Sequence, residues 1–142
     1  MKRPLSFLSI ALLASCLIAP AYAQTAANEL LPDPSNLRVG VDLLTDTNGI
    51  NMTSYMKTLI SALKERWTPL VTSQPTKNRE ETVIDFTIAP DGHIFAMRLE
   101  DSTHEVVFDK AAWSATKATS YLPPPGGMKE PNLKLRAHFT IN

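Results

Sequence analysis

Hydrophobic and polar residues alternate along residues 82–99, TVIDFTIAPDGHIFAMRL. Such alternation is typical of β-strands that bury one face. Pro90-Asp91-Gly92 divides the stretch, and Asp can bond to nearby backbone while Gly can take a positive φ without a Cβ clash. The pattern therefore predicts a β-hairpin. One face of its first strand carries Ile84, Phe86 and Ile88, and one face of its second carries Phe95, Met97 and Leu99.

Two further stretches repeat hydrophobic residues every three or four positions, the spacing of one face of an α-helix. We predict that the first helix is capped by Thr53 and ends at Pro69, which lacks a backbone donor and restricts the preceding residue. Its stripe consists of Met52, Tyr55, Met56, Leu59, Ile60, Leu63 and Trp67, with Trp67 closing the core. The second helix is expected over about residues 105–119, with the stripe Val107, Phe108, Ala111, Ala112 and Ala115.

Alternation returns at both ends of the predicted domain. Residues 39–44 favour a short strand, and residues 133–141 favour a final strand that follows an extended, proline-rich segment, 121–131. The order is (β)-α-β-β-α-β. It predicts an α+β fold with a small antiparallel sheet of three strands, or four if 39–44 is one, and two helices packed on one face.

The first 23 residues have the pattern of a secretory signal. Lys2 and Arg3 precede an apolar run, and Ala21-Tyr22-Ala23 predicts cleavage between Ala23 and Gln24. A second interpretation stays open, because Leu13-Ala14-Ser15-Cys16 fits a bacterial lipobox that would place a lipid on Cys16. In a third, the run stays uncleaved as an inner-membrane anchor. We expect a periplasmic protein with residues 24–38 as a flexible linker and residues 39–142 as its one domain.

The balance of charge and the cysteine count narrow the possible partners and chemistry. The chain carries 14 basic and 14 acidic side chains, which does not favour a nucleic-acid partner. Cys16 is the only cysteine, so the cleaved chain would have neither disulfide nor thiol chemistry.

No candidate catalytic or metal site emerges from the motifs. His93, His104 and His138 lack a second ligand at helical metal-site spacing, and we expect surface positions for them. No phosphate loop or nucleophile motif is found. We therefore expect no enzyme activity and no cofactor. Asp85, on the polar face of its strand, is expected to pair with a nearby Arg or Lys.

The final strand is the candidate binding element. A last strand in a small sheet often lies at an edge, where unpaired backbone groups can accept another chain. Lys134, Arg136 and His138 are equally consistent with a protected edge and with a recognition edge. Edge pairing could also produce a homodimer.

Several segments in order resemble the TonB C-terminal domain family over about residues 39–142. They are Tyr55-Met56 with a helix ending at Trp67, the 82–94 hairpin segment, Phe108-Asp109-Lys110-Ala111-Ala112, and Leu122-Pro123-Pro124-Pro125 before the last strand. The third is similar to the family's Leu-Asp-Arg-Ala-Ala pattern.

The resemblance implies periplasmic protein binding by an α+β domain. Members of this family deliver inner-membrane energy to outer-membrane transporters by pairing their last strand with a transporter's N-terminal segment. Carried onto this chain, the partner-binding residues would be Asn132, Leu133, Lys134, Leu135, Arg136, Ala137, His138, Phe139, Thr140 and Ile141.

Two departures argue against coupling to the ExbB–ExbD motor. TonB proper keeps an uncleaved membrane helix bearing Ser and His, whereas the apolar run here has Ser6, Ser9 and Ser15 but no His. TonB also has a long spacer, whereas residues 24–38 reach only about 50 Å when extended. The first hypothesis is a domain that binds segments of TonB-dependent outer-membrane transporters in energised transport. The alternative is a TolA-like envelope adaptor or lipoprotein without a motor.

Overall fold

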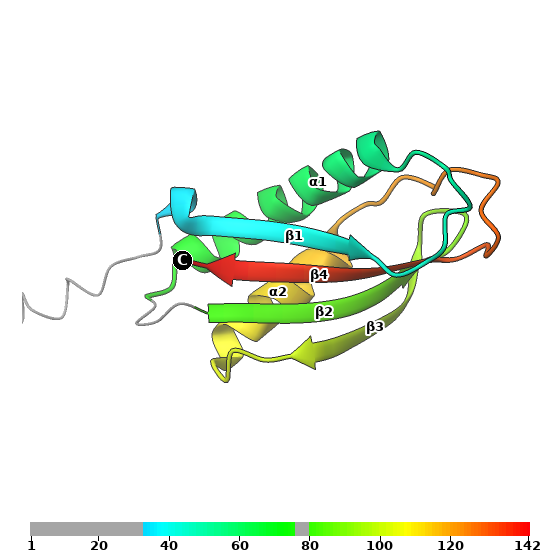
Figure 1. The fold of residues 1–142 in the computed structure, drawn as a ribbon. Helices are drawn as coiled ribbons and strands as arrows, with labels where there is room; N and C mark the ends of the chain where they lie inside the picture. The colour runs from blue at the N-terminus through cyan, green and yellow to red at the C-terminus, as the bar shows by residue number, and fades with distance from the viewer. Residues whose placement is uncertain (1–32, 76–79) are drawn as a thin grey trace, which may run out of the picture.

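Strands and helices alternate along the chain in the computed structural model, which describes residues 33–75 and 80–142. The elements are β1 (Leu37–Leu43), α1 (Thr53–Thr72), β2 (Glu80–Ile88), β3 (Ile94–Asp101), α2 (Val106–Ala118) and β4 (Leu133–Ile141) (Figure 1). A 3₁₀ turn, Pro34–Asn36, precedes β1. The α+β class and the β-α-β-β-α-β order confirm the sequence prediction, and residues 37–43 supply the fourth strand that the sequence left open.

The four strands form one antiparallel sheet in the order β1-β4-β2-β3. Both helices lie on one face of this sheet, and the opposite face is open (Figure 1). The long β4 is therefore covered by neighbouring strands on both sides, while β1 and β3 form the two edges.

The core lies between the helices and the sheet. Trp67 of α1 is 1% exposed and packs edge to face on Phe139 of β4, with ring centroids 5.2 Å apart. Burial of each such aromatic side chain contributes about 1.5–3 kcal/mol. The hairpin residues predicted for one face of β2 are also in this core, namely Ile84, Phe86 and Ile88.

The ends of α1 differ from the prediction. Thr53 is the first helical residue rather than the cap, and its backbone N–H donates to Asn51 Oδ1 at 3.0 Å. The prediction that Pro69 ends the helix is also wrong, because α1 continues to Thr72. Burial of Val71, which is 0% exposed, holds the last turn against the core.

The predicted reversal between β2 and β3 is confirmed. Gly92 N–H donates to the Ala89 carbonyl at 2.9 Å, and Asp91 Oδ1 accepts from His93 N–H at 3.0 Å. Gly92 has φ +92°, and a Cβ there would lie 2.6 Å from the Tyr121 carbonyl oxygen. Glycine is thus required both by the backbone conformation and by the close approach of the loop after α2.

Strand β1 begins at Leu37, two residues before the predicted start at residue 39, so Leu37 and Arg38 belong to the sheet rather than to the linker. The predicted signal (1–23), the processing residues Cys16, Ala23 and Gln24, and linker residues 24–32 lie outside the described residues. Within residues 33–75 and 80–142, no helix combines the length and hydrophobicity needed to cross a bilayer.

Candidate protein-binding surfaces

The predicted binding residues all lie on β4, except Asn132, which directly precedes it. Five of them point into the core and are at most 3% exposed: Leu133, Leu135, Ala137, Phe139 and Ile141. Lys134, Arg136, His138 and Thr140 alternate with these residues and lie on the open face of the sheet. The alternation therefore predicted correctly which side chains of this strand are buried and which lie on the open face.

The prediction that this strand lies at a sheet edge is wrong. β4 pairs with β1 from Leu37↔Ile141 to Leu43↔Leu135, and with β2 from Glu80↔Ile141 to Ile88↔Leu133. Its backbone N–H and C=O groups face neighbouring strands on both sides. A partner chain can pair with β4 only where β1 or β2 has left it.

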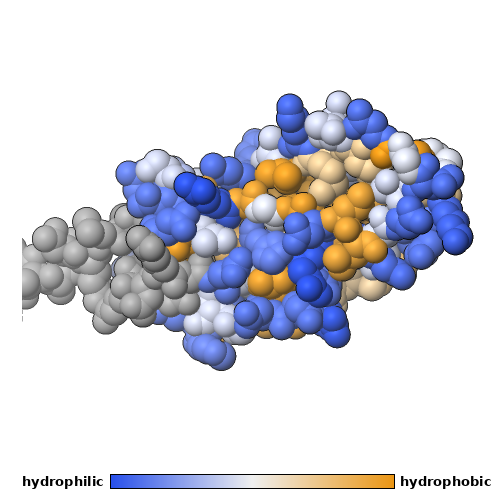
Figure 2. All heavy atoms as spheres, in the orientation of Figure 1, coloured by the Kyte–Doolittle hydropathy of each residue, from blue (hydrophilic) through white to orange (hydrophobic). Residues whose placement is uncertain are grey.

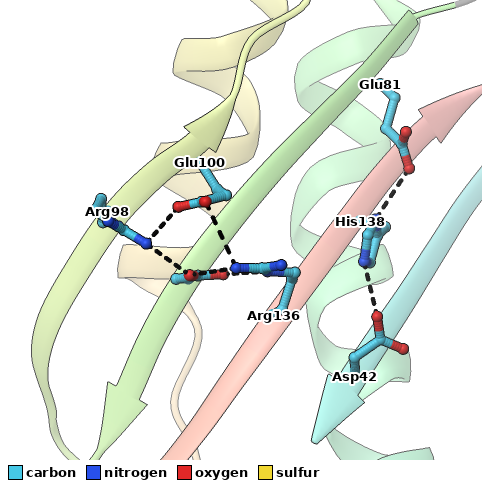
Figure 3. Close-up of polar contacts among 7 residues, drawn as sticks. Asp42, Glu81, Arg98, Glu100, Arg136 and His138 are labelled. Atoms are coloured by element: carbon cyan, nitrogen blue, oxygen red, sulfur yellow. Dashed lines mark hydrogen bonds and ion pairs between the residues drawn. The ribbon is translucent and has the colours of Figure 1, made fainter. Parts of the chain in front are cut away.

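An ion-pair network on the open face joins the three strands β4, β2 and β3 (Figure 3). Arg136 binds Asp85 through two nitrogens, Nε to Oδ1 at 2.7 Å and a terminal nitrogen to Oδ2 at 2.9 Å. Arg98 reaches the same carboxylate at 3.3 Å, and Glu100 contacts both arginines. The predicted pairing of Asp85 with a nearby arginine is confirmed.

This geometry fixes the protonation of Asp85. Its side chain is only 17% exposed. The hydrogen bonds from Arg136 hold the pKa of Asp85 below its usual value against the opposing effect of burial, and Arg98 adds to the lowering. The carboxylate therefore stays charged at neutral pH and fixes the register of three strands.

His138 also lies on the open face of β4, and it makes its contacts toward the β1 edge of the sheet. Its Nδ1 lies 3.0 Å from Glu81 Oε1 on β2, and its Nε2 lies 3.0 Å from Asp42 Oδ2 on β1 (Figure 3). This contact links β1 to the rest of the sheet across the open face. Figure 2 shows that face as mostly hydrophilic, with hydrophobic patches between the charged groups.

The other two histidines lie in loops. His93 follows the hairpin turn and its Nδ1 lies 3.1 Å from Asp91. His104 follows β3 with φ +65°. Both are exposed, as predicted. Among residues 33–75 and 80–142, no group of three His, Cys, Asp or Glu side chains is arranged to hold a metal ion.

Sequence reasoning did not anticipate the exposed apolar residues of β3 and α2. Phe95, Leu99 and Trp113 are 59%, 42% and 37% exposed. Alternation predicted that one face of the hairpin is buried. Which side chains of that face stay exposed depends on how far the helices extend over β3, and the sequence pattern does not show this.

Comparison with protein families gives the class of the domain. Residues 52–139 match the family model described as TonB C terminal, so this chain belongs to the TonB C-terminal family of periplasmic protein-interaction domains. The match begins just before α1 and ends within β4, and it leaves β1 outside. No curated protein and no solved structure matches the chain.

Proposed function

We propose that this domain binds an extended segment of another envelope protein, and that the segment pairs with β4 in place of β1. The segment would come from a TonB-dependent outer-membrane transporter, in keeping with the family. The observation that carries this proposal is the extent of the family match. Within residues 52–139 the strand order is β4-β2-β3, which leaves β4 at an edge, and β1 covers that edge from outside the matched segment.

Exchange of β1 for a partner strand is energetically plausible. An incoming strand would replace the ladder hydrogen bonds of β1 one for one. The remaining cost is the burial of β1 side chains, which falls mainly on Leu37, since Val39, Val41 and Leu43 are only half-buried. A partner segment with apolar residues at alternate positions would therefore compensate for the loss.

A reversible covalent link between β1 and β4 tests the exchange. Arg38 and Thr140 are paired residues on adjacent strands, and Cα separations in such pairs fall within the range of disulfides. In a Cys16→Ser background, we expect oxidised Arg38→Cys/Thr140→Cys to lose at least tenfold in affinity for synthetic peptides that copy N-terminal segments of outer-membrane transporters. Reduction should restore binding, as measured by fluorescence anisotropy.

The matched control is Thr87→Cys/Ala96→Cys, which links β2 to β3 at the other side of the sheet. It should leave peptide binding unchanged in both redox states. Equal binding by the oxidised and reduced β1–β4 variant would show that β1 does not have to leave, and would overturn the proposal.

Dependence on energy distinguishes a transducer from an adaptor. A photo-crosslinking residue at Lys134, an exposed position on β4, should label an outer-membrane transporter in intact cells. Crosslinks that disappear when a protonophore collapses the proton gradient support energised transport. Crosslinks to other envelope proteins that persist under the same treatment support the TolA-like adaptor instead.

A further inference from the structure

The side chains of β1 make few polar contacts with the rest of the sheet. Within the described residues, the only hydrogen bond or ion pair that a side chain of β1 makes joins Asp42 Oδ2 to His138 Nε2, 3.0 Å apart. Just beyond the strand, Thr45 Oγ1 accepts from Lys134 N–H at 2.7 Å, and neither of these groups titrates near neutral pH. The contact between Asp42 and His138 is therefore the attachment of β1 that a change of pH can alter directly.

The imidazole ring of His138 lies between two carboxylates. Its Nε2 faces Asp42 on β1, and its Nδ1 lies 3.0 Å from Glu81 Oε1 on β2 (Figure 3). A neutral imidazole carries one N–H and one lone pair, a protonated imidazole carries two N–H groups, and an ionised carboxylate can only accept. Both contacts can therefore be hydrogen bonds only when His138 is protonated.

Gly40 leaves room for this arrangement. It is the residue of β1 directly opposite His138, and a Cβ added to it would lie 3.9 Å from His138 Cβ. Because glycine has no side chain, the ring of His138 can lean across β1 toward Asp42, which lies two residues further along the same face of that strand. A larger side chain at position 40 would compete with the ring for this space.

Other charged groups of the open face act on the ring from a greater distance. Arg38 of β1 and Arg136 of β4 both disfavour a positive charge on His138, but Asp85 compensates Arg136 through two hydrogen bonds. The charged groups of β3 belong to the network around Asp85, and both helices lie on the other face of the sheet (Figure 1). The balance of charge at the ring is therefore set mainly by the two carboxylates that contact it.

We propose that His138 is a pH-sensitive latch on β1. The protonated ring ties β1 to β4 and β2. As the pH rises and the ring releases its proton to solvent, one N–H remains for two carboxylates, and the contact with Asp42 weakens. By linkage, β1 should leave β4 more readily at higher pH, in the range where histidine titrates. If the proposed exchange of β1 is correct, on which this consequence rests, a partner segment should bind more tightly at higher pH.

Hydrogen exchange of the free protein tests the latch without any partner. Protection factors, corrected for intrinsic exchange rates, are measured at about pH 5.5 and about pH 7.5, within the interval where the charge of histidine changes. Amides of the β2–β3 ladder provide the reference at each pH. Relative to this reference, the protection of β1 amides should fall about threefold at the higher pH, a size typical of ion pairs between partly exposed groups.

Three substitutions distinguish a role of the proton from a purely structural contact. Asp42→Asn and His138→Gln should make the relative protection of β1 equal at the two pH values. Glu81→Gln should instead keep β1 protected at the higher pH as well, because the introduced amide can donate to Nδ1 while the neutral ring donates its Nε2–H to Asp42. A structural contact that simply lost one partner would weaken in all three variants.

The matched control is His93→Gln. His93 also lies beside a carboxylate, that of Asp91, but on the β2–β3 hairpin. This variant should retain the pH dependence of β1. The latch is overturned if β1 of the unaltered protein is equally protected at the two pH values, if Asp42→Asn retains the full pH dependence, or if β1 of Glu81→Gln is less protected than β1 of the unaltered protein at the higher pH.

Peptide binding separates the latch from the exchange of β1. Transporter peptides without histidine should bind the unaltered protein about threefold more tightly at about pH 7.5 than at about pH 5.5, and Asp42→Asn should abolish this difference. If the oxidised β1–β4 variant binds peptides as well as the reduced one, the exchange of β1 is overturned, whereas pH-dependent protection of β1 still supports the latch. If oxidation blocks binding and protection does not depend on pH, the latch alone is overturned.

Discussion

Asp85 illustrates how a single side chain organises the open face of the sheet. It accepts both hydrogen bonds of Arg136 and one of Arg98, from strands on either side of its own. Sequence reasoning could predict that it pairs with an arginine, because its place in the alternation puts it on the polar face. It could not choose between Arg98 and Arg136, since that choice depends on strand order.

Asp85→Asn should lower the free energy of unfolding by about 2 kcal/mol at neutral pH, since it weakens charge-assisted hydrogen bonds in a largely buried site. The folded-state pKa is depressed, so this stabilisation is present above the unfolded-state pKa of about 3.9 and is lost as pH falls through the lower folded-state value. Urea unfolding of both proteins should therefore show a constant difference from pH 7 to about pH 5, shrinking below about pH 4.

Glu65→Gln is the control, because it neutralises an exposed carboxylate on α1. It should change stability by less than about 0.5 kcal/mol at every pH. A difference between Asp85→Asn and the unaltered protein that stayed constant down to pH 3 would contradict this account.

At the scale of elements, α1 shows where local rules fail. A proline removes the donor for the carbonyl four residues earlier, and that rule predicts a helix end near Pro69. The last turn persists because Val71, which is 0% exposed, packs in the core. Tertiary packing of one side chain outweighs a local preference.

Pro69→Ala should therefore stabilise the protein by about 1 kcal/mol, because it restores a donor to the Glu65 carbonyl within an existing helix. The expected readout is a higher melting temperature by circular dichroism. Lys64→Ala, on an exposed turn of the same helix, serves as the control for a simple change in helix propensity. A lower melting temperature for Pro69→Ala would mean that the rigidity of proline in the unfolded chain dominates.

At the scale of the whole molecule, the order of the strands determines which strands have an unpaired edge. The sequence predicted β2, β3 and β4 and the buried faces of β2 and β4, because alternation is local. The predicted face of β3 is wrong at Phe95, because Ile94 pairs with Ile88 and Phe95 is 59% exposed. The central position of residues 133–141 could not be predicted, since it depends on the pairing of β1 with β4. Residues 37–43 are neither long nor strongly apolar, and only their seven register pairs with β4 reveal that role.

Hydrogen exchange should detect that β1 is held less strongly than β4. β1 is held by one ladder, by the buried Leu37 and by three half-buried side chains, whereas β4 is held by two ladders and a fully buried apolar face. Amides of β1 should therefore exchange through a local opening, with a smaller free energy than β4 amides that bond to β2. Mass spectrometry of peptide fragments can compare the two strands.

Amides of β2 that bond to β4 provide the internal reference for global unfolding. Equal free energies of exchange for β1 and for this reference would mean that β1 opens only when the domain unfolds. That result would make the exchange of β1 for a partner too slow and too costly to serve recognition.

The central position of β4 also affects how the protein is made. β1 pairs only with β4, and β2 pairs with β4 along its whole length, so most of the sheet is joined by residues 133–141. A ribosome delivers those residues after every other element. Until they emerge, only the β2–β3 hairpin and the helices can form local contacts. Closing the sheet then brings together residues more than a hundred positions apart, such as Leu37 and Ile141. The four-stranded sheet should therefore close only after residues 133–141 have left the ribosome.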